Sequence, residues 1–579
     1  MPRAERALRT QSLIQIALVV AAVVLVNVLA NSRVAGHRLY TTFDLTEDSR
    51  FTLTPKTEEV VEELEDVIFV RVLMEGEFPA GMKRVQTATR ELLEDLRSIS
   101  SYVEYEFSDP SIGSEETVRA RYRDMAEDGI QPVNLTVGGT SGTERRAIFP
   151  YAIVNYAGRR EIVSLLEQDL PGVPDDVTLS SSVSLLEYKF SKAIRDIQRA
   201  DRPIIAFTTG QGELEPIQTA DLENTLRSNY EVGRLDLDSV VAVPLNIKLL
   251  IVARPTRPFS EKSLFKLDQY IMNGGSVIWS IDQVNMSLDS LRGRKEYYPV
   301  PYELGLEDLF FRYGFRLEND LVMDLRNTRI PLQTGRVGNG PQYELFPYPY
   351  NILALSSGLS PIVKTLDPVN LSFASTIDLS VEAGDRVKKT VLLHSSRNSR
   401  FQRLPVGIDL NVLKYEQEMD LFTKQNLPVA LLLEGRFSSF YTNRLSTDNL
   451  ALLEEIDRPF RPESPPDSRM IVVADGDLLI NPVTPDGKVL PLGVNRYEKV
   501  QFANKDFVIN AIEYLMDDDG VILSRGKEIK IRLLDRALAQ EEAGLWRIVN
   551  VGVPLLLLAV FGGLFTWWRR RRFGRKSSG

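Results

Sequence analysis

The chain contains no cysteine and only two histidines, His37 and His394, among its 579 residues. The absence of cysteine excludes disulfides, thiolate nucleophiles, iron–sulfur clusters and cysteine-based zinc sites. A Ser-His-Asp triad could use only one of these distant histidines, and no G-x-S-x-G nucleophile elbow is present. The G-x-x-x-x-G-K-[ST] phosphate loop of ATPases is missing too. We therefore expect a protein that is not an enzyme and holds neither a cofactor nor a metal.

Two long apolar segments stand at the ends of the chain, at residues 12–30 and 545–568. Each is close to the roughly 20 apolar residues that a helix needs to cross a bilayer. The first segment has an alternative interpretation as a cleaved signal peptide, because small residues at positions 28–30 stand at suitable offsets. Its apolar run is longer than the usual 7–15 residues of a signal peptide, which favours an anchor. The pattern predicts a two-span membrane protein.

The residues that flank the two segments predict their orientation. The short tail 1–11 carries three arginines, and the tail 569–579 is strongly basic. Positive residues stay on the cytoplasmic side, so both tails should be cytoplasmic and the body should lie outside. Tryptophans at both ends of the second segment are typical of the aromatic belt at a lipid interface. The residues expected to anchor the chain in the bilayer are Trp546, Trp567, Trp568, Arg569, Arg570, Arg571 and Arg572.

The part of the chain between the two tails is acidic. Residues 12–568 carry 60 basic and 78 acidic side chains, a net charge of −18. Nucleic-acid binding depends on the neutralisation of phosphates by basic residues. We therefore expect no nucleic-acid partner.

The hydrophobic pattern of residues 40–200 predicts a first α/β domain. Thr54 followed by Pro55 is typical of a helix N-cap and first-turn proline. The hydrophobic spacing then predicts strands and helices in the order β-α-β-α-β-β-α, which is thioredoxin-like. Because the redox C-x-x-C motif is absent, only the scaffold could be shared. The predicted strands are 67–73, 102–107, 132–137, 147–156 and 161–166, the last two turning at Gly158, and the later helices are 82–100, 115–127 and 181–200.

Residues 201–528 predict a second α/β domain. Nearly continuous apolar strands alternate with helices, which indicates a parallel sheet covered on both faces. This is a flavodoxin/glutamine-amidotransferase-like pattern, interrupted by a β-rich insertion at about 327–426. A short charged stalk, 529–544, then leads to the second apolar segment. The predicted strands are 204–207, 249–252, 276–281 and 469–474, and the helices are 261–272, 304–313 and 505–516.

Polar residues follow three of these strands, where ligands bind in open parallel sheets. Gly210 and Gly212 resemble half of a dinucleotide fingerprint, although position 215 is Glu where the third glycine is expected. The turn is therefore either a phosphate loop or a tight structural turn. Asp475 and Asp477 could hold a divalent cation or cap the following turn. The candidate ligand-binding residues are Gly210, Gln211, Gly212, Glu213, Asp282, Asp475 and Asp477.

Two further features leave alternatives open. The aromatic run at 346–350 could stack a sugar or peptide, or it could pack inside the protein. Gly562 and Gly563 in the second apolar segment could allow close contact with another membrane helix, or they could only make the helix flexible.

Several segments, taken in order, resemble one known family. They are FDLTEDSRFTLTPKT after the first apolar segment, SDP at 108–110, DGIQPV at 128–133, FTTGQGELE at 207–215, VVADGDLLINP at 472–482 and the segment from FANKDFV to IRLLD at 502–535. Together with the two apolar segments they resemble the GldG family of gliding-motility-associated ABC transporter auxiliary proteins. No single motif is specific alone, but the resemblance covers nearly the whole body.

The resemblance implies partners and a location. The partners would be a GldF-type permease and a GldA-type cytoplasmic ATPase, and the location the bacterial inner membrane with the body in the periplasm. The family is often labelled substrate-binding, but no substrate follows from this sequence. Such proteins typically read G-H-G-E where this chain has Gly210, Gln211, Gly212 and Glu213. The loss of the imidazole argues against acid–base chemistry at this turn.

The functional hypothesis is a non-catalytic, membrane-anchored subunit of an ABC transporter-type complex linked to gliding motility. Its body would transmit motion or dock partners outside the membrane. The alternative is an extracytoplasmic module that binds a glycan or peptide at the strand-end cleft.

Overall fold

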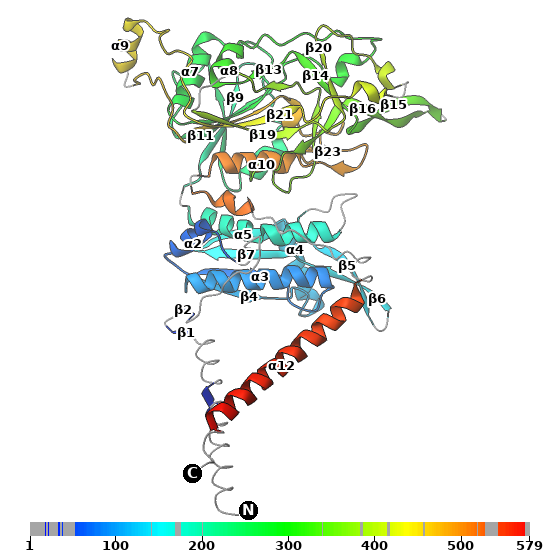
Figure 1. Ribbon diagram of the computed structural model, residues 1–579. Coiled ribbons are helices and arrows are strands. Elements are labelled where there is room, and N and C mark those ends of the chain that lie inside the picture. Colours follow the sequence, from blue (N-terminus) through cyan, green and yellow to red (C-terminus); the bar gives the residue numbers. More distant parts are fainter. Residues whose placement is uncertain are drawn as a thin grey trace, which may run out of the picture. The chain divides into compact units, whose positions relative to one another are not determined.

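The computed structural model describes residues 18, 21–22, 33–34, 37–38, 52–139, 142–167, 175–199, 201–337, 340–381, 386–413, 417–455, 458–517, 519–526 and 542–573. It is a mixed α/β structure (Figure 1). The chain divides into two compact units, Met1–Glu528 and Ile529–Gly579. Within the larger unit we call residues 52–199 together with 519–526 the first lobe, and residues 201–517 the second lobe.

A four-stranded sheet forms the centre of the first lobe. Its order is β4-β3-β7-β8, in which β3 and β4 are parallel and the other pairs are antiparallel. The turn between β7 and β8 contains Gly158 at φ 77°, as the sequence predicts. The strands are β3 (Ile68–Val72), β4 (Val103–Phe107), β7 (Tyr151–Tyr156) and β8 (Arg159–Ser164), and the helices are α2 (Pro55–Glu62), α3 (Ala80–Ile99), α4 (Glu115–Glu127) and α5 (Asp175–Gln198).

One predicted strand of the first lobe does not join this sheet. β5 (Val133–Gly139) pairs only with β6 (Gly142–Ile148), as a separate hairpin. The sequence predicted a single strand over 147–156, but the chain leaves the extended ladder at Phe149 and Pro150 before β7 begins. Proline has no N–H to donate to a ladder, which explains the break between β6 and β7.

The second lobe contains a ten-stranded sheet. Five neighbouring strands are parallel, in the order β10-β9-β11-β12-β22, and the sheet continues with antiparallel β21, β19, β16 and β15, with β17 also paired to β16. These strands are β9 (Ile204–Thr209), β10 (Glu231–Asp236), β11 (Ile247–Ala253), β12 (Ser276–Ser280), β15 (Asn327–Val337), β16 (Gly340–Ser356), β17 (Val369–Ser372), β19 (Val387–His394), β21 (Pro428–Gly435) and β22 (Arg469–Val473).

The region predicted as an insertion at about 327–426 does not stand apart from the sheet. Its strands β16 and β19 continue the main sheet through β21, which pairs antiparallel with β22. The sheet is therefore parallel only in part. Smaller pairs in the second lobe are β13 (Arg316–Leu317) with β18 (Ile377–Asp378), β14 (Asp320–Asp324) with β20 (Ser399–Arg403), and β23 (Val494–Asn495) with β24 (Val500–Gln501).

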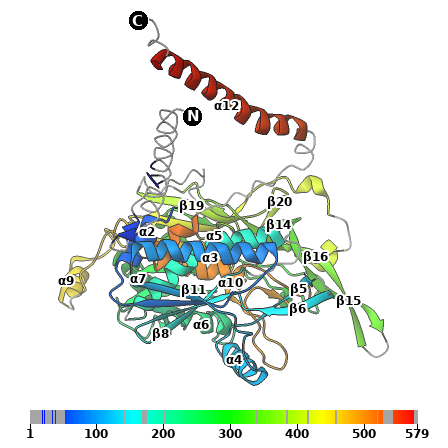
Figure 2. The ribbon, with the colours of Figure 1, turned by 90° about the horizontal axis from the view of Figure 1, so that it is seen from below.

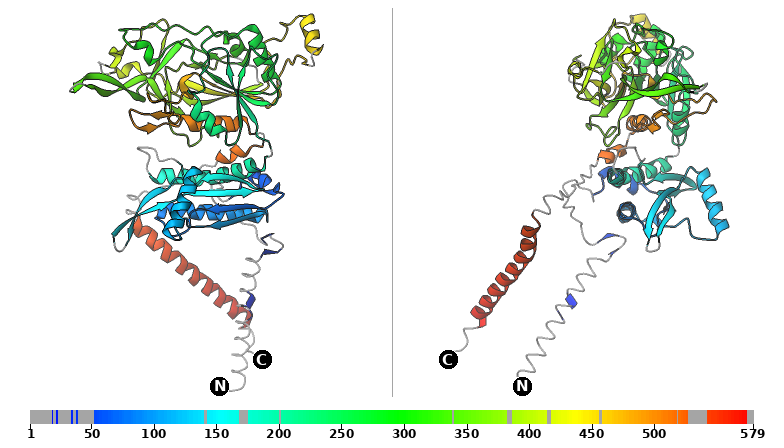
Figure 3. Two further views of the ribbon diagram at one scale, coloured as in Figure 1. Left: turned by 180° about the vertical axis from the view of Figure 1, so that it is seen from behind. Right: turned by 90° about the vertical axis from the view of Figure 1, so that its right-hand side faces the viewer.

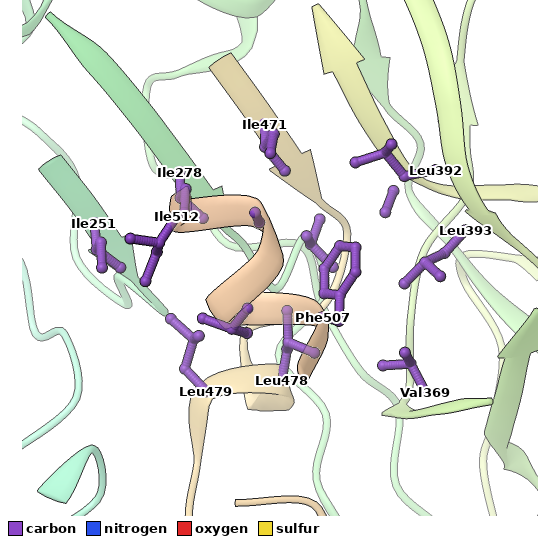
Figure 4. Packing of buried hydrophobic residues seen from close by; sticks show 14 of the residues in the cluster. Ile251, Ile278, Val369, Leu392, Leu393, Ile471, Leu478, Leu479, Phe507 and Ile512 are labelled. Atoms are coloured by element: carbon purple, nitrogen blue, oxygen red, sulfur yellow. The ribbon is translucent and has the colours of Figure 1, made fainter. Parts of the chain in front are cut away.

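Helices cover both faces of the parallel strands (Figure 1). Successive side chains of a strand point to opposite faces. Ile251 of β11 accordingly packs in the cluster that contains Phe507 and Ile512 of α10, whereas Leu250 packs in the cluster that contains Leu267 of α7. Figure 4 shows Phe507 and Ile512 gathered with side chains of the strands. The helices of this lobe are α6 (Ala220–Leu226), α7 (Glu261–Met272), α8 (Glu307–Tyr313), α9 (Thr447–Glu455) and α10 (Asn504–Leu515).

Two elements project from the second lobe. The hairpin of β15 and β16 and the short helix α9 extend away from the sheet (Figures 2 and 3). The exposed side chains of Tyr343 and Leu345 lie on the hairpin. Short 3-10 helices complete this lobe at Leu288–Leu291, Leu410–Leu413, Met419–Leu421 and Asp477–Leu479.

The first lobe is completed by residues from beyond the second lobe. The 3-10 helix η5 (Val521–Gly526) buries Val521 and Ile522 in the same cluster as Val61 of α2 and Ile194 of α5. At the other end of the lobe, the N–H and hydroxyl of Thr54 donate to Glu187 of α5 at 2.6 and 2.9 Å. The described body therefore begins and ends on the same lobe.

The smaller unit contains helix α12 (Ala543–Phe573). Its part Ala543–Arg571 is long and apolar enough to cross a membrane, by length and composition. The first apolar segment, predicted as a span, and most of the predicted stalk lie outside the described residues, except for Leu18, residues 21–22 and 542–544. The short strands β1 (Arg33–Val34) and β2 (His37–Arg38) pair antiparallel after that segment.

Candidate functional site

The candidate residues named from the sequence lie at one edge of the second lobe's sheet. They follow β9, β12 and β22, and because these strands are parallel their carboxyl ends share an edge. At this edge the structure forms two hydrogen-bonded groups of residues. One is the turn after β9, and the other is a cluster of aspartates around Arg254, which follows β11.

The turn Gly210–Glu213 is closed by the loop after β11. The carbonyl of Gln211 accepts the N–H groups of Thr256 and Arg257, both at 2.9 Å. Gly210 and Gly212 have φ of 109° and 76°, a conformation that favours glycine. A Cβ at Gly212 would lie 2.3 Å from the hydroxyl oxygen of Thr256. The two glycines therefore serve close packing of two loops.

Buried polar groups remain in this turn. The side chain of Gln211 is 2% exposed, and its Nε2 donates to Asp238 Oδ2 at 3.2 Å. Its backbone N–H donates to Glu213 Oε2 at 2.7 Å, so this N–H is already engaged inside the turn. Gln211 Oε1 and Glu213 Oε1 accept no hydrogen bond from the described part of the chain.

Arg254 connects two of the aspartates. Its Nε donates to Asp282 Oδ2 at 2.8 Å, and its Nη1 lies 3.1 Å from Asp477 Oδ1. The other oxygen of Asp282 accepts the N–H of Gly476 at 2.6 Å. Arg254 was not among the residues predicted from the sequence. Its position directly after the buried strand 247–253 was the signal that could have identified it.

Asp475 is fully buried, and both oxygens of its carboxylate accept backbone hydrogen bonds. Its two carboxylate oxygens accept the N–H groups of Ser372 and Asp477, each at 2.6 Å. A carboxylate saturated in this way fixes the turn between β22 and the following 3-10 helix to β17. Within the described ranges, no group of three or more His, Asp or Glu residues is arranged to hold a metal ion.

The carboxyls of this cluster have raised pKa values. Burial, followed by the charges of Asp477 and Asp282, raises the pKa of Asp475 well above its ordinary value. Burial and the charge of Asp282 raise the pKa of Asp477 to about 7, against the opposing charge of Arg254. Burial also raises the pKa of Asp282. One guanidinium thus lies beside the buried carboxyls of Asp282 and Asp475 and the half-buried carboxyl of Asp477, which favours proton uptake near neutral pH.

A second buried polar network joins the two lobes. Lys192 Nζ on α5 lies 3.0 Å from Asp196 Oδ2 and 3.3 Å from Glu513 Oε1 on α10. Arg195 Nη1 donates to Asp517 Oδ1 at 2.8 Å. We call these five residues the α5 network. These residues were not predicted from the sequence, although three of them are charged residues between apolar ones on the helix predicted over 181–200.

The predicted anchoring residues lie on α12. The rings of Trp546, Trp567 and Trp568 are each more than half exposed within the structure. Trp546 Nε1 donates to Glu542 Oε2 at 3.0 Å, and the guanidinium carbon of Arg571 lies 4.9 Å from the centroid of the Trp567 ring. The helix continues through Arg569, Arg570 and Arg572.

The aromatic run at 346–350 contributes to the protein interior. Tyr348 and Tyr350 are 0% and 4% exposed, and their ring centroids lie 5.8 and 5.6 Å from that of Phe373. These two rings therefore pack inside the second lobe and are not free to stack a ligand.

Comparison with known protein families gives two matches to parts of this chain. Residues 202–511 match ABC_transp_aux, described as an ABC-type uncharacterized transport system. The chain belongs to this family. Residues 47–155 match a second family, described as a domain of unknown function, DUF7088. No curated protein matches the chain.

Two solved structures are similar over part of the chain. The mmIFT52 N-terminal domain has 14% identity and a TM-score of 0.31, covering 55% of this chain and 98% of its own. The exo-beta-1,4-mannosidase Op5Man5 from Opitutaceae bacterium strain TAV5 has 12% identity and a TM-score of 0.18, covering 51% and 35%. Both scores are too low to support an argument about fold or function.

Proposed function

We propose that this ABC transport auxiliary protein is a non-catalytic, membrane-anchored subunit of an ABC transporter-type complex linked to gliding motility. The observation that carries the proposal is the family match over residues 202–511. The resemblance of the motifs to the GldG family supports the finer assignment, with a GldF-type permease and a GldA-type ATPase as partners. The body would lie in the periplasm and both tails in the cytoplasm of an inner-membrane protein.

The placement of the chain ends on the body favours a mechanical role. The first lobe binds the incoming chain through Thr54 and the outgoing chain through Val521 and Ile522. Movement of either membrane segment relative to the other would therefore act first on this lobe. In this proposal the first lobe has a thioredoxin-like scaffold without redox chemistry.

The α5 network would then carry the movement to the second lobe. The side chains of Lys192 and Arg195 are both less than 20% exposed, and each forms an ion pair with a carboxylate of the second lobe. Separating buried charge pairs leaves uncompensated charges, which costs several kcal/mol. The two lobes should consequently respond as one body when partners in the membrane move.

The test replaces residues 545–568 with an unrelated apolar helix of equal length and measures which proteins co-purify. We expect the permease and the ATPase to be lost while the protein stays in the membrane fraction. The control variant Gly562→Leu changes one small residue, and we expect a smaller loss. Retention of both partners by the swapped variant would contradict a docking role for this helix.

A second candidate function is an extracytoplasmic module that binds a glycan or peptide. A groove of about 460 Å³ in the first lobe favours it, because it combines charged and apolar groups. Its lining includes the guanidinium groups of Arg71, Arg121 and Arg160, the carboxylates of Glu106, Asp109, Asp124 and Asp128, and apolar Ile112 and Ile153. Binding pockets of proteins commonly have this size. A thermal-shift screen with oligosaccharides and peptides would distinguish it from the first proposal, which predicts no stabilisation.

A further inference from the structure

A cavity of about 520 Å³ lies between the two lobes of the larger unit. The first lobe contributes residues from the end of β8 and from α5, and the second lobe contributes residues 365–367 and the start of α10. Small-molecule sites typically have volumes of about 300–1,000 Å³ and are frequent between domains. The size and the place of this cavity are therefore those of a ligand site.

The charges that line the cavity are mainly negative. They comprise the carboxylates of Glu167, Asp367 and Asp506 and the ammonium of Lys189. Lys189 is already engaged, because its Nζ lies 2.6 Å from Glu167 Oε1 and donates to the carbonyl of Leu166 at 3.3 Å. Two carboxylates, those of Asp367 and Asp506, have neither an ion pair nor a hydrogen bond to any residue that the structure describes.

The electrostatics of the cavity favour a cationic ligand. Burial, together with the nearby charge of Glu167, raises the pKa of Asp367 above its ordinary value. A cation placed beside this carboxylate would offset both effects. Lys189, Lys505 and Arg525 offset part of the negative charge near Glu167 and Asp506. Within the described residues none of these cations forms an ion pair with Asp367 or Asp506, so the lining suits a cationic ligand better than an anion.

The remaining walls indicate an organic body. Leu185, Leu366 and Phe502 line the same cavity, and they offer apolar surface and one aromatic ring. An ammonium group binds favourably to a carboxylate and over an aromatic ring, and its alkyl chain gains from apolar contact. Hydrated inorganic ions gain little from such walls.

We propose that the cavity between the lobes binds an aliphatic ammonium or diammonium compound. Its charged groups would pair with Asp367 and Asp506, and its carbon chain would lie against Leu366 and Phe502. Because the two lobes supply the walls jointly, the bound compound would add contacts between α5 and the start of α10. This inference goes beyond the proposed function and does not depend on it.

The test uses the full chain purified in mild detergent. Isothermal titration calorimetry and thermal unfolding are measured with 1,4-diaminobutane, n-butylammonium, butyrate and magnesium chloride at constant ionic strength. We expect saturable binding and stabilisation by the two ammonium compounds and none by butyrate or magnesium. Asp367→Asn combined with Asp506→Asn should weaken the affinity about tenfold or more, as expected for lost bonds to charged groups.

A matched control removes two exposed carboxylates elsewhere, by Glu65→Gln combined with Glu303→Gln. This control should leave the affinity unchanged. If the double aspartate variant does not fold, each single substitution is measured in its place. The proposal is overturned if neither ammonium compound binds saturably, if butyrate or magnesium stabilises the protein equally, or if the aspartate variants bind like the control.

Discussion

At the scale of single residues, most polar groups at the carboxyl-terminal edge of the second lobe's sheet form hydrogen bonds with one another. Gln211, Arg254 and Asp475 use backbone and side-chain groups of neighbouring loops. The turn that contains two glycines resembles a nucleotide loop in sequence, but its backbone faces the loop after β11. We therefore assign this edge a structural role and expect its substitutions to change stability.

The first prediction concerns Gly212→Ala. Both Gly212 and Gly293 have left-handed backbone, with φ of 76° and 72°, but a Cβ at Gly293 would contact nothing within 4 Å. Each substitution should therefore cost about 1 kcal/mol of strain. Gly212→Ala should cost at least about 1 kcal/mol more because its Cβ meets the Thr256 hydroxyl. Urea unfolding followed by tryptophan fluorescence compares them, and equal losses would contradict the close packing.

The second prediction concerns the pH dependence of stability. The pKa of Asp477, about 7 in the folded protein, lies above the ordinary value of 3.8. The folded state therefore binds this proton more tightly, so the stabilisation is complete below about pH 4 and is lost as the pH rises through 7. Asp477→Asn should remove this loss.

Unfolding curves at pH 5 and pH 8 measure this effect. From pH 5 to pH 8 the wild type should lose on the order of 2–3 kcal/mol more than the variant. Asp308→Asn, at an exposed position of the same lobe, is the control and should keep the wild-type dependence. Identical pH dependence in wild type and Asp477→Asn would show that this carboxyl titrates normally.

At the scale of elements, helices with capping residues could be predicted to the residue. Helices α4 and α7 have the predicted bounds, because Ser114 and Ser260 accept the N–H groups of Thr117 and Ser263. An N-cap interaction involves only neighbouring residues, so three or four residues of the sequence are enough to predict where a helix begins. The start of α2 at Pro55 was predicted correctly for the same reason.

The pairing of strands could not be predicted in this way. β21 separates the parallel and antiparallel halves of the large sheet, yet nothing in 428–435 alone identifies its neighbours 34 to 48 positions away. Pairing at such distances depends on the packing of the whole lobe. The candidate residues after β9, β12 and β22 were placed at one edge because parallel strands share that edge, whereas Arg254 was missed because it follows a strand without a motif.

The third prediction concerns the α5 network. Arg195 is 8% exposed and Asp517 is 1% exposed in their side chains, and Asp517 also accepts the N–H groups of Val521 and Ile522. Arg195→Met should therefore cost about 3–5 kcal/mol, because it removes the ion pair of the buried Asp517 carboxylate, whereas Asp196 keeps Lys192. Arg119→Met removes an exposed pair with Glu115 on α4 and should cost at most about 1 kcal/mol.

Chemical unfolding measures the loss of stability in each variant and so tests whether the α5 network stabilises the protein more than an exposed ion pair does. Hydrogen exchange adds a more specific readout. Arg195→Met should increase exchange in α5, in η5 and at the end of α10, whereas Arg119→Met should affect α4 only. Comparable stability losses in the two variants would contradict the assigned role of the network.

At the scale of the whole molecule, three features agree with a subunit that responds to partners. The second lobe belongs to an ABC transport family, and helix α12, in the part of the chain that the structure describes, is long and apolar enough to cross a membrane. The described body begins and ends on the first lobe, which is tied to the second by buried charges. These features are those expected of the proposed subunit, whose body would act by association with partners.

The most direct measurement is native purification of the protein from membranes in mild detergent, with mass spectrometry of everything that co-elutes. We expect a permease and an ATPase in fixed ratio to this chain, retained through a second, orthogonal purification step. A protein that elutes alone and stays stable without partners would contradict the central claim that it is a subunit of such a complex.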